Sequence, residues 1–166
     1  MGSTVRTTNN IPRITRALRD IGRKEIQVGV FDGGEIGMIA AVHEYGTKIP
    51  VTQKMRGWFG ANGFPLRKDT QYIVIPERSF IRGGYDEYID KTADKIETLL
   101  PHVISLALDS SAFLDAIGTD LASHIKKYMN ELDNPPNADM TVERKNSSNP
   151  LIDSGRLRGA ITHRIE

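Results

Sequence analysis

Apolar residues in the first part of the chain fall first at helical spacing, then in alternation with polar residues, and then in a short helix-length apolar run. At residues 11–22 they fall three and four apart among arginines, which predicts a short basic amphipathic helix. Residues 25–31 alternate between apolar and polar and predict a strand with one buried face. Residues 36–45 are apolar enough for a short helix, which Gly46 ends.

The second half of the chain is dominated by one long helical pattern. After Gly83-Gly84, which close the preceding segment, residues 85–107 carry apolar side chains every three or four positions. Pro101 should start a new helix or kink the existing one. The Asp-Ser-Ser run at 109–111 lies inside the helical stretch, and the apolar stripe continues over 114–132.

Two further strands complete the pattern and define the fold class. Residues 72–75 are apolar on both faces, as in a central strand, and 160–165 alternate again. Strands that flank one large helical block indicate an α+β fold, a small and mostly antiparallel sheet packed against long helices. The 166 residues form a single domain, with a basic N-terminal helix within 1–24 and a loop at 134–150 before a C-terminal turn and strand.

Residues 47–70 differ in kind, because a stretch of this length without periodicity is unusual in a compact domain. Its charged residues are Lys48, Lys54, Arg56, Arg67 and Lys68 against Asp69 alone. We expect a long projecting arm or hairpin that contacts a neighbouring subunit or ring, since aromatic and arginine side chains most often anchor interfaces. The interface candidates are Lys54, Arg56, Trp58, Phe59, Phe64 and Arg67. The alternative is a hairpin folded back on its own domain, with Trp58 in the core.

The overall charge argues against a dedicated nucleic-acid binder. Lys and Arg number 22 against 21 Asp and Glu, a net charge of +1, whereas such proteins carry a large basic excess. The chain contains no cysteine, which excludes a disulfide framework, a thiolate metal site and a cysteine nucleophile. No apolar stretch approaches the roughly 20 residues that cross a bilayer, so no membrane partner is expected.

Two motifs of enzyme chemistry are begun but not completed. Gly29 and Gly34 match the glycines of a phosphate-binding loop, but Glu35 follows where a lysine is needed and would repel phosphate. His43-Glu44 opens like a zinc-protease helix, yet the second histidine is missing, so both residues are expected to cap or pair locally at the helix end. The sequence therefore predicts no catalytic residue, no metal, no nucleotide and no other cofactor.

Three segments in a fixed order carry a resemblance to a known family. They are residues 43–47 after the short apolar helix, 75–81 after a strand, and 150–157 near the end of the chain. Their motif residues are His43, Glu44, Gly46, Pro76, Arg78, Phe80, Asp153, Gly155 and Leu157. Together the segments resemble the small tail-completion, or virion-morphogenesis, proteins of tailed bacteriophages, in the members that carry a long insertion near residues 50–58.

The resemblance implies a structural protein of the phage particle and not an enzyme. Such proteins lie at the head-proximal end of the tail or in the neck and commonly form homo-oligomeric rings, here expected to be hexamers. The implied partners are other copies of the chain, adjacent neck or connector proteins, and the tail-tube or tail-terminator protein, with DNA only as the passing genome. The implied location is the virion, and the host cytoplasm during assembly.

The motif residues have ordinary physical roles that agree with this resemblance. Gly46 can take a positive φ angle at the end of a helix, Pro76 ends a strand, and Phe80 is expected to be buried. Asp153 or Ser154 is expected to cap a turn. The motifs are thus determinants of the fold and of its interfaces.

The competing interpretation is a nucleic-acid-binding module that uses the loop cations and the basic N-terminal helix. The arginines of that helix are Arg13, Arg16, Arg19 and Arg23. A solvated helix face explains the same pattern without any partner. Salt-dependent binding of DNA would favour the module, whereas a discrete oligomer without affinity for DNA would favour the structural ring.

Overall fold

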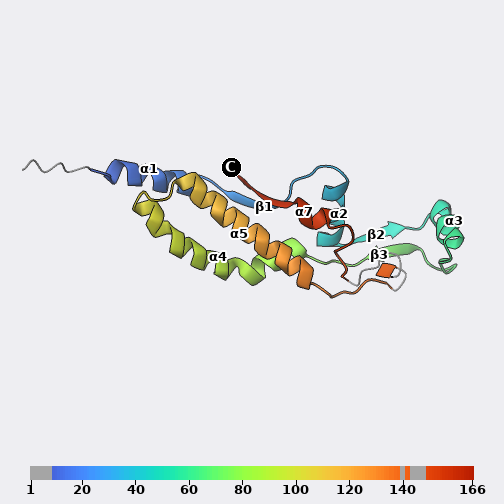
Figure 1. The fold of residues 1–166 in the computed structure, drawn as a ribbon. Helices are drawn as coiled ribbons and strands as arrows, with labels where there is room; N and C mark the ends of the chain where they lie inside the picture. Colours follow the sequence, from blue (N-terminus) through green and yellow to red (C-terminus); the bar gives the residue numbers. More distant parts are fainter. Residues whose placement is uncertain (1–8, 139–140, 143–148) are drawn as a thin grey trace, which may run out of the picture.

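The computed structural model describes residues 9–138, 141–142 and 149–166 of the chain. These residues form an elongated molecule, in which a long helical hairpin lies against short strands and a slender arm projects at one end (Figure 1). The strands make two separate antiparallel pairs. The α+β architecture expected from the sequence, a small antiparallel strand set packed against long helices, is confirmed.

The helical hairpin consists of α4 (Phe80–Ile104) and α5 (Ser110–Glu131), which pack along their lengths. Pro101 was expected to start a new helix or to kink the existing one. It does not start a new helix, because it lies in the last turn of α4, where its missing N–H removes a single hydrogen bond. The expectation that Gly83 and Gly84 close a segment was wrong, because both residues lie inside α4. A Cβ atom on Gly84 would stand 3.0 Å from the Cα of Ile125, so a residue without a side chain lets α4 and α5 approach closely.

Asp109 is the N-cap residue of α5, and Ser110 and Ser111, expected inside the helical stretch, form the start of this helix. Its Oδ1 accepts hydrogen bonds from the backbone N–H groups of Ser111 and Ala112, at 2.9 and 3.0 Å, and from the Ser111 hydroxyl. These bonds satisfy donors that a helix leaves free at its first turn. They also lower the pKa of the Asp109 carboxyl, the bond from the Ala112 N–H being the largest cause.

We predict that Asp109→Ala lowers the melting temperature at pH 7 and that the difference from the wild type shrinks at acid pH. A carboxyl whose pKa is lower in the folded state stabilises the fold above the ordinary aspartate range of about 4, and this stabilisation is lost as the pH falls through the folded-state pKa. Thermal melts between pH 2 and pH 7 measure the effect. Asp133→Ala, at an exposed position, is the control and should show no such dependence; a pH-independent deficit in Asp109→Ala would contradict the prediction.

The first strand pair joins a strand from the first part of the chain to the last strand. β1 (Ile26–Val30) runs antiparallel to β4 (Ile161–Ile165), with Ile26 opposite Ile165 and Val30 opposite Ile161. Both strands pack on α5, so the predicted strands at 25–31 and 160–165 are confirmed.

Two clusters of buried side chains form the core along the helical hairpin. The larger cluster comprises Ile36, Ala40, Phe80, Leu121, Ala122, Ile125, Met129, Leu151, Leu157 and Ile161. The smaller cluster, toward the turn between the helices, comprises Val103, Phe113, Leu114 and Ile117. Phe80 is fully buried, as expected from its motif. Neither cluster includes a residue of the projecting arm.

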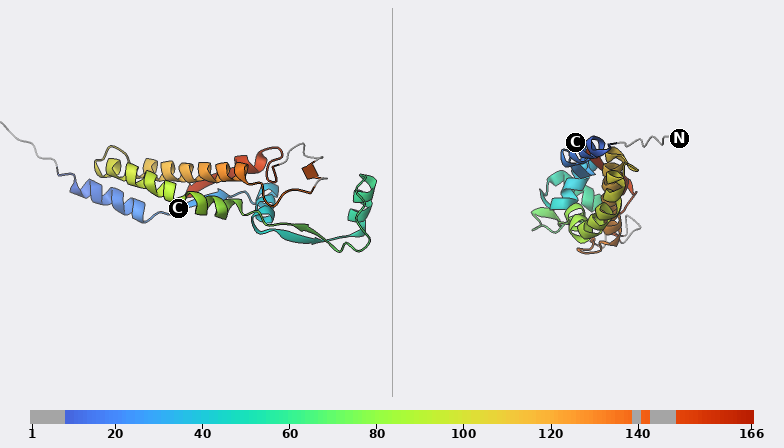
Figure 2. Two further views of the ribbon diagram at one scale, coloured as in Figure 1. Left: turned by 90° about the horizontal axis from the view of Figure 1, so that it is seen from below. Right: turned by 90° about the vertical axis from the view of Figure 1, so that its left-hand side faces the viewer.

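The basic helix α1 (Ile11–Gly22) begins within two residues of the first described position. It lies beside the turn of the helical hairpin, at the end of the molecule away from the arm (Figure 2). The sequence places Ile14, Leu18 and Ile21 on one apolar face of this helix. In the structure Ala17 and Ile21 pack against the smaller cluster, whereas Leu18 is exposed. The four arginines predicted to surround the stripe are all exposed.

The remaining elements lie toward the arm. Helix α2 (Glu35–Tyr45) packs against the short helix α7 (Arg156–Ala160), which leads into β4. After α2 the chain enters the second strand pair, β2 (Thr47–Pro50) with β3 (Tyr72–Ile75), and helix α3 (Gln53–Ala61) lies between these strands in sequence. Of the loop expected at 134–150, residues 139–140 and 143–148 lie outside the described part of the chain.

Candidate functional site: the arm and its base

The arm is a two-stranded ribbon with a helix at its tip, and it comprises residues 47–75. Strands β2 and β3 carry the chain away from the body, and α3 lies across the far end (Figures 1 and 2). The projecting hairpin expected at 47–70 is therefore present, and it extends to Ile75 because β3 is its return strand. The expectation that residues 72–75 form a central strand was wrong, since β2 is the single partner of β3 among the described strands and Tyr72 and Val74 are exposed.

Hydrogen bonds within the arm hold the tip helix on the ribbon. The Thr52 hydroxyl accepts from the Met55 N–H at 3.2 Å and caps α3. The Arg56 guanidinium donates to the backbone carbonyls of Arg67, Lys68 and Thr70 on the returning chain. Arg56 was an interface candidate, and in the structure its side chain links α3 to the returning segment within the arm.

The surface of the arm is unusually apolar for an element that projects into solvent. Eleven large apolar side chains are exposed in the described part of the chain, and five of them belong to the arm: Ile49, Trp58, Phe64, Tyr72 and Val74. Trp58 is 45% exposed, so the alternative that places it in the core was wrong. Its ring meets the half-buried Phe59 edge to face at 5.0 Å. A ribbon of two strands is marginally stable in water by itself.

Most cationic side chains of the arm form no ion pair with an acidic side chain among the described residues. Arg67 pairs with Asp69 at 3.1 Å, but both side chains are largely exposed and the pair contributes little stability. Lys48, Lys54 and Lys68 take part in no ion pair among the described residues. The arm therefore presents positive charge beside its exposed aromatic side chains.

The base of the arm is tied to the helical hairpin by Glu44, which is buried at the end of α2. Its Oε2 accepts from the Ile81 N–H at 2.9 Å, and its Oε1 accepts from the Arg82 N–H at 3.1 Å and the Arg82 Nε at 3.0 Å. The carboxylate thus caps the first turn of α4 from another element. Local pairing at the helix end was expected of Glu44, and this expectation was wrong, because its partners lie 37 and 38 positions away.

Gly46 allows the chain to turn from α2 into the arm. Its φ is +67°, as its motif predicted, and an added Cβ would stand 2.8 Å from the Glu77 nitrogen. Beyond Pro76, which follows the last residue of β3 as expected, the Arg78 N–H donates to the His43 carbonyl at 2.7 Å. Two of the three motif segments therefore meet at the base of the arm.

Arg78 is buried and fastens the segment after α5 to the same place. Its Nε donates to the Pro135 carbonyl at 2.8 Å, and its Nη2 donates to the Pro136 carbonyl at 2.9 Å. Burial lowers the pKa of the Arg78 guanidinium, which stays charged at neutral pH because an arginine starts from a very high value. The motif residue acts as a positioning residue for the loop.

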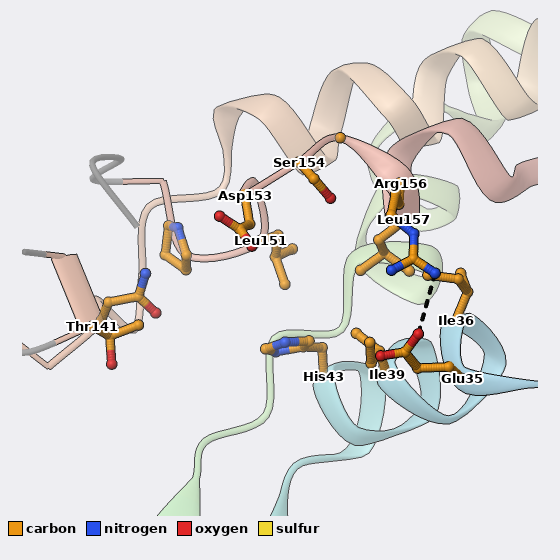
Figure 3. A pocket seen from close by; sticks show the side chains of 13 residues that line it. Glu35, Ile36, Ile39, His43, Thr141, Leu151, Asp153, Ser154, Arg156 and Leu157 are labelled. Carbon is orange, nitrogen blue, oxygen red and sulfur yellow. Dashed lines mark hydrogen bonds and ion pairs between the residues drawn. The ribbon is translucent and has the colours of Figure 1, made fainter. Parts of the chain in front are cut away.

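The third motif segment faces α2 across a cavity of about 390 Å³ (Figure 3). His43, Asp153, Gly155 and the buried Leu157 line it. At its rim, Arg156 pairs with Glu35 at 3.2 Å. Neither Asp153 nor Ser154 caps α7, so that expectation was wrong. The N-cap residue is Gly155, whose φ of +76° reverses the chain without a side-chain bond.

The glycine turn before α2 and the histidines were the places where the sequence began a motif of enzyme chemistry or offered metal ligands. At the glycine turn before α2, the Asp32 carboxylate accepts from the Gly34 N–H at 2.9 Å, and Glu35 follows, so two carboxylates surround the place where a phosphate would bind. No three His, Asp or Glu side chains gather as ligands within the described ranges. His163 pairs with Asp115 and His124 with Asp120, on separate parts of α5.

Comparison with known proteins identifies no relative: no family model, curated protein or solved structure matches the chain. Among the described residues, none of the helices combines the length and apolar character that would let it cross a membrane.

Sequence reasoning missed the tip helix α3. The signal that could have found it is the N-cap residue Thr52 before an arm segment free of proline until residue 65. The helix carries no buried residue, and so it lacks the apolar stripe by which helices are recognised.

Proposed function

We propose that this chain is a structural protein of a tailed-phage particle, which assembles as a homo-oligomeric ring of six copies at the head–tail junction and joins the tail to the head. The observation that carries the proposal is the arm. The arm exposes five large apolar side chains and contributes no residue to either core cluster of its own domain. Assembly with a neighbour would bury this surface.

The arrangement of the motif residues supports the proposal. The residues that carry the resemblance to tail-completion proteins are gathered at the base of the arm and around α2, where they fix the direction of the arm. The subunit is elongated, with the exposed apolar side chains of the arm at one end and the basic helix α1 at the other. These two ends offer separate surfaces for a neighbour in the ring and for an adjoining component. Identical subunits with head-to-tail contacts form a ring when the rotation from one subunit to the next closes.

Deletion of the gene from the phage or prophage that carries it tests the proposal. We expect filled heads and separate tails in electron micrographs, few infectious particles, and recovery when the chain is supplied from a plasmid. A reconstruction of the complemented particles should place six copies at the neck. Joined, infectious particles formed without the chain would overturn the proposal.

A second candidate is a nucleic-acid-binding module centred on α1. The observation that favours it is a shallow groove of about 510 Å³ on this helix, which Arg16, Arg19 and Arg23 line. Affinity for DNA that falls steeply with salt and is lost when these arginines are replaced would favour this function.

A further inference from the structure

An apolar groove lies between β1 and the helical hairpin, outside the arm and its base. Its volume is about 320 Å³, and its apolar lining comprises Ile26, Val28, Ile81, Tyr85, Leu121 and Ile125. Tyr85 is 46% exposed at its mouth. Beside the groove, β1 pairs with β4 on one edge only among the described strands. The groove is large enough for one aromatic side chain.

One rim of this groove continues into an acidic face of α4. Asp86 lines the groove, and Asp90, Asp94 and Glu97 follow it at steps of four, four and three, so the four carboxylates lie on one side of the helix. All four are exposed, and none of them takes part in an ion pair in the described part of the chain. Arg82, also at the groove, is already engaged by Glu44 and Glu77.

The outer face of α3 has the complementary character. Lys54 and Trp58 are four residues apart, so they are neighbours on this face, and both are exposed. Met55 and Phe59, one position further along, are half-buried. The tip of the arm therefore presents an aromatic ring beside a cation, and the groove presents an apolar floor beside a carboxylate.

We propose that the outer face of α3 of one copy docks in this groove of a second copy, with Trp58 against the apolar floor and Lys54 beside Asp86. The occupant is a second copy because charge and apolar character match within the same chain, and because the arm extends away from its own groove (Figure 1). The two surfaces differ, so the contact is heterologous and repeats from subunit to subunit. The inference rests on the proposed ring and names the contact that builds it.

Self-association of the full chain, measured by sedimentation over a range of concentrations, tests the contact. Trp58→Ala should raise the dissociation constant about 30-fold or more, as expected for a central aromatic anchor. Phe64→Ala, which removes an exposed aromatic of the arm outside α3, is the control and should change it less than about threefold. Lys54→Glu and Asp86→Lys should each weaken association, and the double variant should recover it. Equal losses for Trp58→Ala and Phe64→Ala, or no recovery in the double variant, would overturn the proposal.

Cross-linking keeps the test decisive when association of the isolated chain is weak. The chain has no cysteine, so introduced cysteines are unique. Lys54→Cys lies at the end of the outer face of α3 that is proposed to meet Asp86, and Asp90→Cys lies one turn of α4 beyond Asp86. A mixture of these two variants, which carry tags of different mass, should give the mixed dimer with a short bismaleimide. Ala61→Cys, on the same face of α3 but at the end away from Asp86, should give much less, and equal yields from both pairs would overturn the proposal.

The outcomes for this contact and for the proposed function are separable. Loss of the specific cross-link overturns the contact even if the gene proves essential for joining heads to tails. Infectious particles without the gene overturn the function even if the cross-link and the charge exchange succeed.

Discussion

Replacement of the arm beyond its ribbon, residues 51–71, by Asn-Gly is expected to give a folded protein that no longer joins heads to tails. The register of β2 and β3 places Pro50 opposite Tyr72, and Asn-Gly is the favoured two-residue connection of such a hairpin. No residue of the arm belongs to either core cluster, and shortening a loop costs little entropy. The melting temperature should stay within about 4 °C of the wild type, the shift that roughly 1 kcal/mol produces in a domain of this size.

Complementation of the gene deletion measures the second half of this prediction, as the number of infectious particles with each variant. A control in which Gly-Ser residues replace 51–71 at equal length separates the loss of side chains from the loss of length. Both variants should fail to complement if the exposed side chains of the arm make the contact. Full complementation by either variant, or unfolding of the Asn-Gly variant, would show that the arm is not the assembly element.

Glu44→Ala is expected to cause one of the largest losses of stability available to a single substitution in this chain, about 2–4 kcal/mol. The substitution removes a buried acceptor from the N–H groups of Ile81 and Arg82, which begin α4, and from the Arg82 guanidinium. Buried donors without a partner carry the full cost of desolvation. Urea unfolding followed by circular dichroism gives the free energy of unfolding.

Glu77→Ala is the matched control, because Glu77 also pairs with Arg82, at 2.8 Å, but both side chains are about half exposed. A solvent-exposed ion pair contributes about 0–1 kcal/mol, so this variant should unfold close to the wild type. Glu44→Gln keeps one acceptor oxygen and should fall between the two. If Glu44→Ala were no less stable than Glu77→Ala, the capping of α4 by Glu44 would be without consequence for the fold.

Local patterns in the sequence predicted the elements that bury one face. The helix at 11–22 and the strands at 25–31 and 160–165 were found because burial on one side gives the sequence a regular period. The helix at 36–45 was found from its apolar composition and from Gly46 at its end. The arm was found from the opposite signal, a long stretch without a period. Its tip helix was missed for the same reason, since α3 buries no residue.

The strand at 72–75 illustrates where a local pattern is ambiguous. Tyr72 and Val74 are apolar on the face that an ordinary surface strand leaves polar, and this is also the pattern of a central strand. Composition alone does not separate a strand that is covered on both faces from one that leaves an apolar face exposed. The exposure of Tyr72 and Val74, and the ribbon's position outside the core clusters, decide between them.

The sequence by itself determined the α+β class, the order of the periodic elements, the existence of the arm and the roles of Gly46, Pro76 and Phe80. Only the tertiary structure decided what the motif segments do together. Glu44 caps a helix that begins 36 positions later, and Arg78 holds carbonyls 57 and 58 positions away. The physical reason is that periodicity records which face of an element is buried, whereas hydrogen bonds between distant segments depend on how the chain is folded back, which leaves no local period to read.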